Sequence, residues 1–199
     1  FSFKVAFFIS SAISLSLNSS AIAILPKVSI RGVFKSFSIL NIVNGTYLSS
    51  FDSTWASLIV DTNWHVGGVG DSEYYTAKEY YEFEFGDRPS SSTIYNAKIG
   101  LMYVSDYGYA ATPDNWNTVL GDYHLAADSN WLYYNDYYDL TISPSTNVNS
   151  IMIISSDSGS ITSARPSTQY PYRPVFYLNS NVLYSSGTGT SSNPIRIVV

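Results

Sequence analysis

The stretch IMIISSDSGS, residues 151–160, gives the clearest indication of how this chain folds. The apolar run Ile151–Ser155 has the length and composition of a buried strand. Asp157 and Gly159 are typical turn residues, because Asp bonds to its own backbone and Gly adopts positive φ without strain. Since a second β-like run follows, the stretch predicts a β-hairpin and therefore a sheet.

The same pattern extends from Asn44 to the end of the chain: short apolar runs are separated by Gly, Ser, Asn, Asp and Pro. Such spacing is typical of many short strands joined by turns. The last run is expected to be tied into a sheet, because a free end would not need so many apolar residues. The further predicted strands are Ile99–Val104, Val175–Leu178 and Ile195–Val199.

Two segments of this region favour helices. Ser49–Val60 has apolar residues at helical spacing, with Ser53 as the N-cap. Glu73–Phe85 is a second helix candidate, although its acids and Tyr pairs also fit a strand or a loop. We therefore expect an α+β domain of short, mainly antiparallel strands with one or two helices and long loops.

Composition and charge limit the classes of function. At 199 residues the chain is long enough for one domain and a short extra segment. Its 15 acids all follow residue 50, where only six bases accompany them, which argues against a nucleic-acid partner. It has no Cys, which removes disulfides and thiol chemistry. Its 18 Tyr suit either a wet contact surface or a half-buried sheet.

The N-terminal region resembles an export signal. Lys4 precedes an apolar stretch, Val5–Leu17, and Ala21-Ile22-Ala23 is a small-x-small cleavage site. A membrane anchor and a buried core segment are the other two interpretations of residues 1–25. Residues 26–43 are expected to be a connecting segment with a weak strand signal, followed by the domain at 44–199. Membrane contact is expected through the N-terminal segment alone.

Catalytic and metal-binding patterns are weak. His65 and His124 are expected in turns or on the surface. If the segment that holds Glu79, Glu82 and Glu84 were a strand, it would bring two carboxylates close together. The pair that would then suit glycoside hydrolysis is Glu82 and Glu84. Solvated acids are the simpler interpretation, so we expect no enzyme. No cofactor is expected; for calcium, the candidate oxygen ligands are Asp114, Asn115, Asp122, Asp128 and Asp136, whose spacing matches no calcium loop.

An aromatic segment, residues 130–139, reads NWLYYNDYYD and is the strongest candidate for ligand contact. Rings pack against the C–H faces of sugars while amides and carboxylates take the hydroxyl groups. The competing interpretation is a buried Trp131 with solvent-facing Tyr on a loop. The predicted contact residues are Trp131, Tyr133, Tyr134, Asn135, Asp136, Tyr137 and Tyr138.

Several segments resemble an uncharacterised C-terminal domain of surface proteins from Gram-positive-type and wall-less gut bacteria. The most specific are Arg-Pro-Val-Phe-Tyr-Leu at 173–178 and Gly-Thr-Ser-Ser-Asn-Pro at 189–194, and the resemblance covers about residues 44–199. The other matching segments are Thr54-Trp55, 64–68, 95–110, 130–132, 140–144 and 172–182.

This family is similar to the C-type-lectin-like fold, in the branch of formylglycine-generating enzymes and variable receptor-binding proteins. The resemblance implies a ligand surface on loops between residues 133 and 172. It does not carry over the enzymes' chemistry, which needs cysteines or three iron-binding His, nor the calcium-dependent sugar motifs. Val5 stands where a prepilin helix would have a glutamate.

The expected function is therefore that of an extracellular or cell-surface binding module for a glycan or a host or bacterial surface protein. A pilin-like structural subunit is the alternative. Arg173 is expected to pair with a carboxylate and Pro174 to open a strand.

Overall fold

The predicted hairpin forms one edge of the largest sheet in the computed structural model, which describes residues 28–29, 36–66, 74–85, 93–145, 150–164, 170–188 and 193–198. β6 (Ile151–Ile154) pairs antiparallel with β7 (Ile161–Ala164). Gly159 in the connecting turn has a φ of 69°, the left-handed region that glycine adopts without strain.

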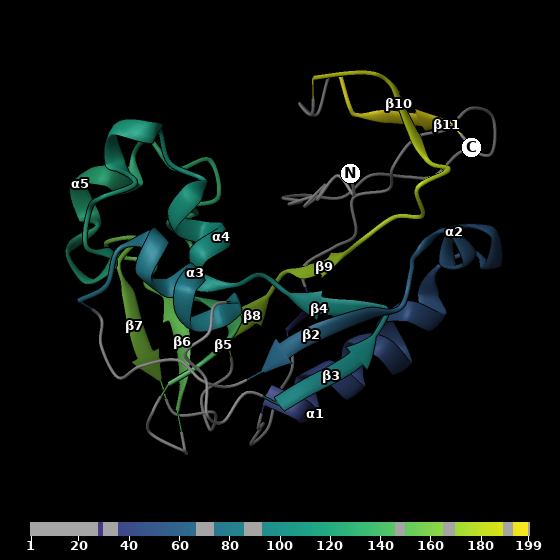
Figure 1. Ribbon diagram of the computed structural model, residues 1–199, viewed down its shortest axis with the longest axis horizontal. Helices are drawn as coiled ribbons and strands as arrows, with labels where there is room; N and C mark the ends of the chain where they lie inside the picture. Colours follow the sequence, from purple (N-terminus) through teal and green to yellow (C-terminus); the bar gives the residue numbers. More distant parts are fainter. Residues whose placement is uncertain are drawn as a thin grey trace.

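Around this hairpin the sheet has five strands in the order β1-β8-β5-β6-β7 (Figure 1). β5 pairs antiparallel with β6 and parallel with β8, and β8 pairs antiparallel with β1. The register between β5 and β6 shifts between Leu140 and Pro144. The added strands are β5 (Asp139–Pro144), β8 (Pro171–Tyr172) and β1 (Val28–Ser29).

The other strands form three antiparallel pairs. Pro174 does open a strand, and the C-terminal strand is tied into a sheet, as expected. The strand predicted at Val175–Leu178 ends at Phe176, two residues early. Leu178 forms an isolated bridge with Ile59 instead. The pairs are β2 (Thr62–Val66) with β3 (Thr93–Ala97), β4 (Ile99–Leu101) with β9 (Pro174–Phe176), and β10 (Leu183–Ser186) with β11 (Arg196–Val198).

Short helices accompany the sheets. In Figure 1, α3, α4 and α5 gather beside the β5-β6-β7 part of the large sheet, and α1 lies beside β3. Helices together with mainly antiparallel strands confirm the α+β class. The helices are α1 (Ser36–Ile42), η1 (Val43–Tyr47, a π-helix), η2 (Leu48–Ser50), α2 (Ser53–Leu58), α3 (Ala77–Phe85), α4 (Val104–Tyr109), η3 (Pro113–Asn115), η4 (Leu120–Asp122) and α5 (His124–Ala127).

The helix predicted at Ser49–Val60 is shorter, and its cap was assigned one residue too late. Asp52 is the N-cap, since its side chain accepts from the Thr54 N–H at 2.8 Å, and Ser53 is the first helical residue. The helix ends at Leu58, because the backbone there turns to pair with another segment. The Val60 N–H donates to the Tyr177 carbonyl at 3.0 Å.

The second predicted helix is confirmed as α3, although it begins at Ala77 rather than Glu73, which lies outside the described residues. Thr76 and Glu79 form a reciprocal cap at its start. The Glu79 carboxylate accepts from the Thr76 N–H at 2.8 Å, and the Glu79 N–H donates to the Thr76 hydroxyl at 3.4 Å. These contacts fix the helix start.

Two strand predictions are wrong in part. The run Ile99–Val104 is a strand only to Leu101, because Val104 begins α4. Among the described residues of 27–43, Val28–Ser29 is the one strand, whereas Ser36–Ile42 is helical. Ile39, Leu40 and Val43 are each at most 3% exposed, at the i, i+1 and i+4 spacing of a helix face. The expected connecting segment therefore contributes to the core.

No helix among the described residues is long and apolar enough to cross a membrane. Residues 1–25, to which the export-signal and anchor interpretations apply, lie outside the described part of the chain.

Trp64 on β2 is the largest residue of the core and is 1% exposed. Its indole N–H donates to the Ala97 carbonyl at 2.9 Å, and its ring lies over Gly100 on β4. A Cβ at Gly100 would lie 2.4 Å from the Trp64 ring. No other residue type fits there unless the tryptophan moves.

We therefore expect Gly100→Ala to lower the free energy of unfolding by about 1–3 kcal/mol, the usual cost of overpacking a dense core. Urea unfolding followed by tryptophan fluorescence measures this. Gly45→Ala in η1 is the matched control, because a Cβ there has nothing within 4 Å. Equal stability of the two variants would contradict the close Trp64–Gly100 contact.

Candidate functional site

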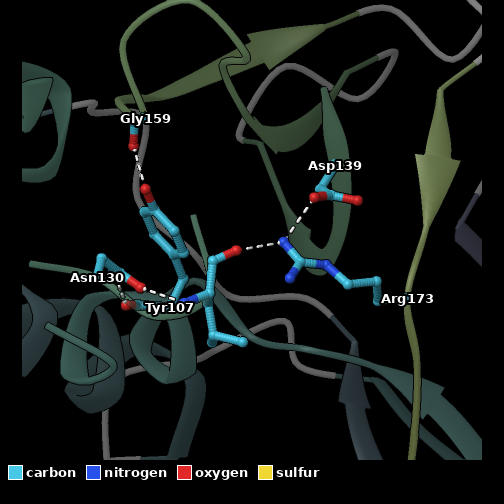
Figure 2. A network of polar contacts seen from close by, with 6 residues as sticks. Tyr107, Asn130, Asp139, Gly159 and Arg173 are labelled. Atoms are coloured by element: carbon cyan, nitrogen blue, oxygen red, sulfur yellow. Dashed lines mark hydrogen bonds and ion pairs between the residues drawn. The ribbon is translucent and has the colours of Figure 1, made fainter. Parts of the chain in front are cut away.

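The aromatic segment lies between α5 and β5, and its ends are held by a buried polar network (Figure 2). Arg173, between β8 and β9, donates to the Asp139 carboxylate at 2.6 Å and to the Leu132 carbonyl at 2.7 Å. The Asp139 side chain is only 3% exposed and that of Arg173 16%. This confirms that Arg173 pairs with a carboxylate and shows that it also fixes the backbone of the segment.

Asn130 anchors the start of the segment. Its buried amide donates to the Tyr107 carbonyl at 2.7 Å, and its side-chain oxygen accepts from the Leu132 N–H at 2.9 Å. The Tyr107 hydroxyl in turn donates to the Gly159 carbonyl at 2.7 Å, in the β6–β7 turn (Figure 2). Burial raises the pKa of Tyr107, so it stays a neutral donor. Helix α4, the segment and the hairpin turn are thus joined through the side chains of Asn130 and Tyr107.

Two of the predicted contact residues belong to this framework rather than to the surface. The Tyr133 hydroxyl donates to the Ser156 carbonyl at 2.8 Å. The Tyr138 hydroxyl is 3.4 Å from the Asp157 carboxylate, and its ring lies 5.5 Å from that of Tyr170. Both tyrosines are half-buried. The segment is therefore pinned at both ends against the β6–β7 turn.

The other five predicted residues are exposed. Trp131 is 63% exposed, Tyr134 42% and Tyr137 50%, which settles that this tryptophan is not buried. The Tyr134 and Tyr137 rings are stacked, with centroids 6.2 Å apart and planes 20° from parallel. Asn135 and Asp136, between them in the sequence, are also exposed. We call residues 131–138 the aromatic loop.

Carboxylates surround the tyrosines of this loop. A hydrogen bond with the Asp136 side chain is the main cause that raises the pKa of Tyr134. For Tyr133, burial raises the pKa first, and the charges of Asp157 and Asp128 add to it. The loop therefore combines exposed rings, acceptor groups and negative charge.

The acidic cluster at Glu79, Glu82 and Glu84 does not form a catalytic pair. The segment is helix α3, in which residues two apart point in directions about 200° apart, so the shared face assumed for a strand does not exist. Glu79 is exposed and caps the helix, Glu82 is half-buried, and Glu84 is 2% exposed.

Glu84 instead lies inside the core at the junction of α3, α4 and β5. It accepts from the Val104 and Ser105 N–H groups at 3.1 and 3.3 Å, and from the Ser143 hydroxyl at 2.5 Å. Burial raises its pKa to about 8. Its contacts explain why α4 begins at Val104, together with the local cap in which the Asp106 carboxylate accepts from the Tyr103 N–H at 3.2 Å.

Metal-ligating side chains do not gather in the part of the chain that the structure describes. No group of three or more His, Cys, Asp or Glu there could hold a metal ion. Asn115, one of the calcium candidates, donates to the Thr112 and Ser129 hydroxyls. His124 is exposed, whereas His65 lies half-buried on β2 with its ring 5.5 Å from that of Phe85, and not in a turn. Calcium binding stays an untested prediction.

Comparison of the chain with protein-family models, with curated proteins and with solved structures finds no match in any of the three.

The aromatic loop is therefore the feature of the chain that bears most directly on function. The sequence pointed to its residues but not to Asn130 and Arg173 as the groups that hold it. The sequence does contain one sign of how the loop is held: the polar residues Asn130 and Asp139 stand at the two ends of the aromatic run.

Proposed function

We propose that this chain is an extracellular or cell-surface binding module that recognises a glycan through the aromatic loop. The observation that carries the proposal is the set of three exposed rings, Trp131, Tyr134 and Tyr137, on a loop whose ends are fixed by buried hydrogen bonds. A group of exposed aromatic rings is typical of a binding surface, and sugars offer C–H faces to such rings.

Preorganisation supports binding as the role of the loop. Arg173 and Asn130 hold its backbone, and the Tyr133 and Tyr138 hydroxyls fix its far side. A loop fixed in advance loses less conformational entropy when it binds, which favours affinity. Asn135 and Asp136 then supply the acceptor and donor groups that sugar hydroxyls require.

A C-type-lectin-like fold and a location outside the cell are part of the same proposal. A C-type-lectin-like arrangement is consistent with a mixed α+β domain that presents a long loop from a pinned base, and a location outside the cell depends on the export-like pattern of residues 1–25. We propose no enzymatic activity, because the one buried carboxylate of the acidic cluster, Glu84, is enclosed in the core.

The test is a glycan array and a bacterial and host cell-surface array, probed with the full 199-residue chain. A variant with Trp131, Tyr134 and Tyr137 changed to Ala should lose binding by about 30-fold or more, the usual effect of removing aromatic hot spots. Tyr133 and Tyr138 stay in place because they hold the loop. Circular dichroism checks that the variant is folded.

Tyr184→Ala is the matched control. Tyr184 is 66% exposed and belongs to β10, which lies far from α5 and β5 in Figure 1. Its loss should leave binding unchanged. Full binding by the triple variant would overturn the proposal. Binding to protein surfaces alone would replace the glycan by a protein partner, and no binding by the unaltered chain would favour the structural-subunit alternative.

A further inference from the structure

The exposed charged side chains that act on the tyrosines of the aromatic loop are carboxylates. Asp128, Asp136 and Asp157 are all exposed and all act on the loop tyrosines. Asp157 reaches the Tyr138 hydroxyl from the β6–β7 turn, and Asp136 bonds to Tyr134 from within the loop. These carboxylates come from three separate segments, and each acts on a tyrosine of the loop.

Bases in the described part of the chain do not offset this charge. Arg173 is the one next to the loop, and it is already paired with the buried Asp139. Lys98 donates to the carbonyls of Ala56 and Ile59, at the end of α2. Lys78 lies on α3 and Arg196 on β11. Among the described residues, a ligand at the loop therefore meets exposed rings and carboxylates together.

From this combination we infer that the aromatic loop selects a polysaccharide whose sugars carry free amino groups. The inference rests on the proposed function and names the substrate class of the same site. An ammonium group is attracted to the face of a tyrosine or tryptophan ring and to the carboxylates beside it, while the C–H face of the same sugar packs on the next ring. Acidic glycans are repelled by the same carboxylates.

A matched pair of ligands tests the charge alone. Oligomers of glucosamine and of N-acetylglucosamine share the sugar ring and the linkage, and only the first carries ammonium groups. Binding is measured by calorimetry with the full chain at mildly acidic pH, where the amines are protonated and aspartates stay ionised. We expect the glucosamine oligomer to bind more tightly than its acetylated partner, and heparin oligosaccharides not to bind.

Removing single carboxylates should reduce this preference. Asp136→Asn and Asp157→Asn each keep an acceptor oxygen, and each should weaken glucosamine binding by about fivefold, as expected for the loss of an exposed ion pair. Binding of the acetylated oligomer should fall by a smaller factor, because that ligand has no ammonium group and loses no ion pair. Added salt should have the same selective effect, since it screens exposed charges. Asp61→Asn, an exposed site before β2, is the control.

The outcomes separate this inference from the proposed function. Equal binding of both oligomers, lost together in the triple ring variant, would leave the proposed function standing and overturn the amino-sugar selectivity. Tighter binding of heparin would overturn it as well. If the ring variant binds both oligomers as well as the unaltered chain does, the aromatic loop is not the site and both proposals fail.

Discussion

Replacing Arg173 with leucine is expected to lower the free energy of unfolding by about 3–5 kcal/mol, the cost of removing one partner from a buried ion pair. The Asp139 carboxylate, 3% exposed, would lose the guanidinium that lies 2.6 Å away. The Leu132 carbonyl would also lose its donor. Since a single side chain holds both groups, the stability of the domain and the position of the aromatic loop depend on it together.

A double-mutant cycle with Asp139→Asn measures this coupling by chemical denaturation. The double variant should be more stable than Arg173→Leu alone, because it no longer buries a carboxylate without its cation. Arg196→Leu, exposed on β11, is the control and should change stability by no more than about 0.5 kcal/mol. A loss below about 1 kcal/mol for Arg173→Leu would show that the pair is solvated and that the loop is held by other contacts.

Elements whose signals are local were predictable from the sequence. The β6–β7 turn depends on a glycine at positive φ, β6 on an unbroken apolar run, and α3 on a helical segment that begins at its own cap. Each of these signals lies within a few residues of the element it specifies. For this reason the α+β class and several strands could be predicted without knowledge of the packing.

Elements decided by distant partners could not be predicted in the same way. Val104 extends an apolar run that reads as a strand, yet its N–H is capped by Glu84, 20 residues away in sequence. Likewise, α2 ends where Val60 meets Tyr177. Such contacts exist only after the chain has folded, so no local pattern contains them.

In the candidate site, too, part could be predicted from the local sequence and part depends on distant contacts. Composition alone singled out the aromatic loop, but it gave no reason to separate Tyr133 and Tyr138 from Tyr134 and Tyr137. The separation is made by Ser156 and Asp157, which take the hydroxyls of the first two and leave the other rings exposed. The framework and the contact surface are thus interleaved along one stretch of sequence.

Changing Glu84 to Gln is expected to flatten the dependence of stability on pH. The pKa of Glu84 is about 8 in the folded chain, against 4.5 as its ordinary value, and burial is the largest cause. Below pH 4.5 the group is protonated in both states, so its contribution is fully present there. As the pH rises toward 8, the unfolded chain ionises first and this contribution is lost, by an amount on the order of 3–5 kcal/mol.

Thermal unfolding of both proteins across this pH range measures the effect. Glutamine keeps an acceptor for the Val104 and Ser105 N–H groups but has no charge to bury, so its curve should be flatter and should lie above that of the unaltered chain at the alkaline end. Glu82→Gln, half-buried on the same helix, should keep the original slope. The charge of Asp106 on α4 also raises the pKa of Glu84. Tyr103 lies near Glu84 as well, and β5 contributes the neutral Ser143. A slope that survives in Glu84→Gln would mean that another group carries the pH dependence and that the buried carboxyl is ionised throughout, held by the three donors at the start of α4 and on β5.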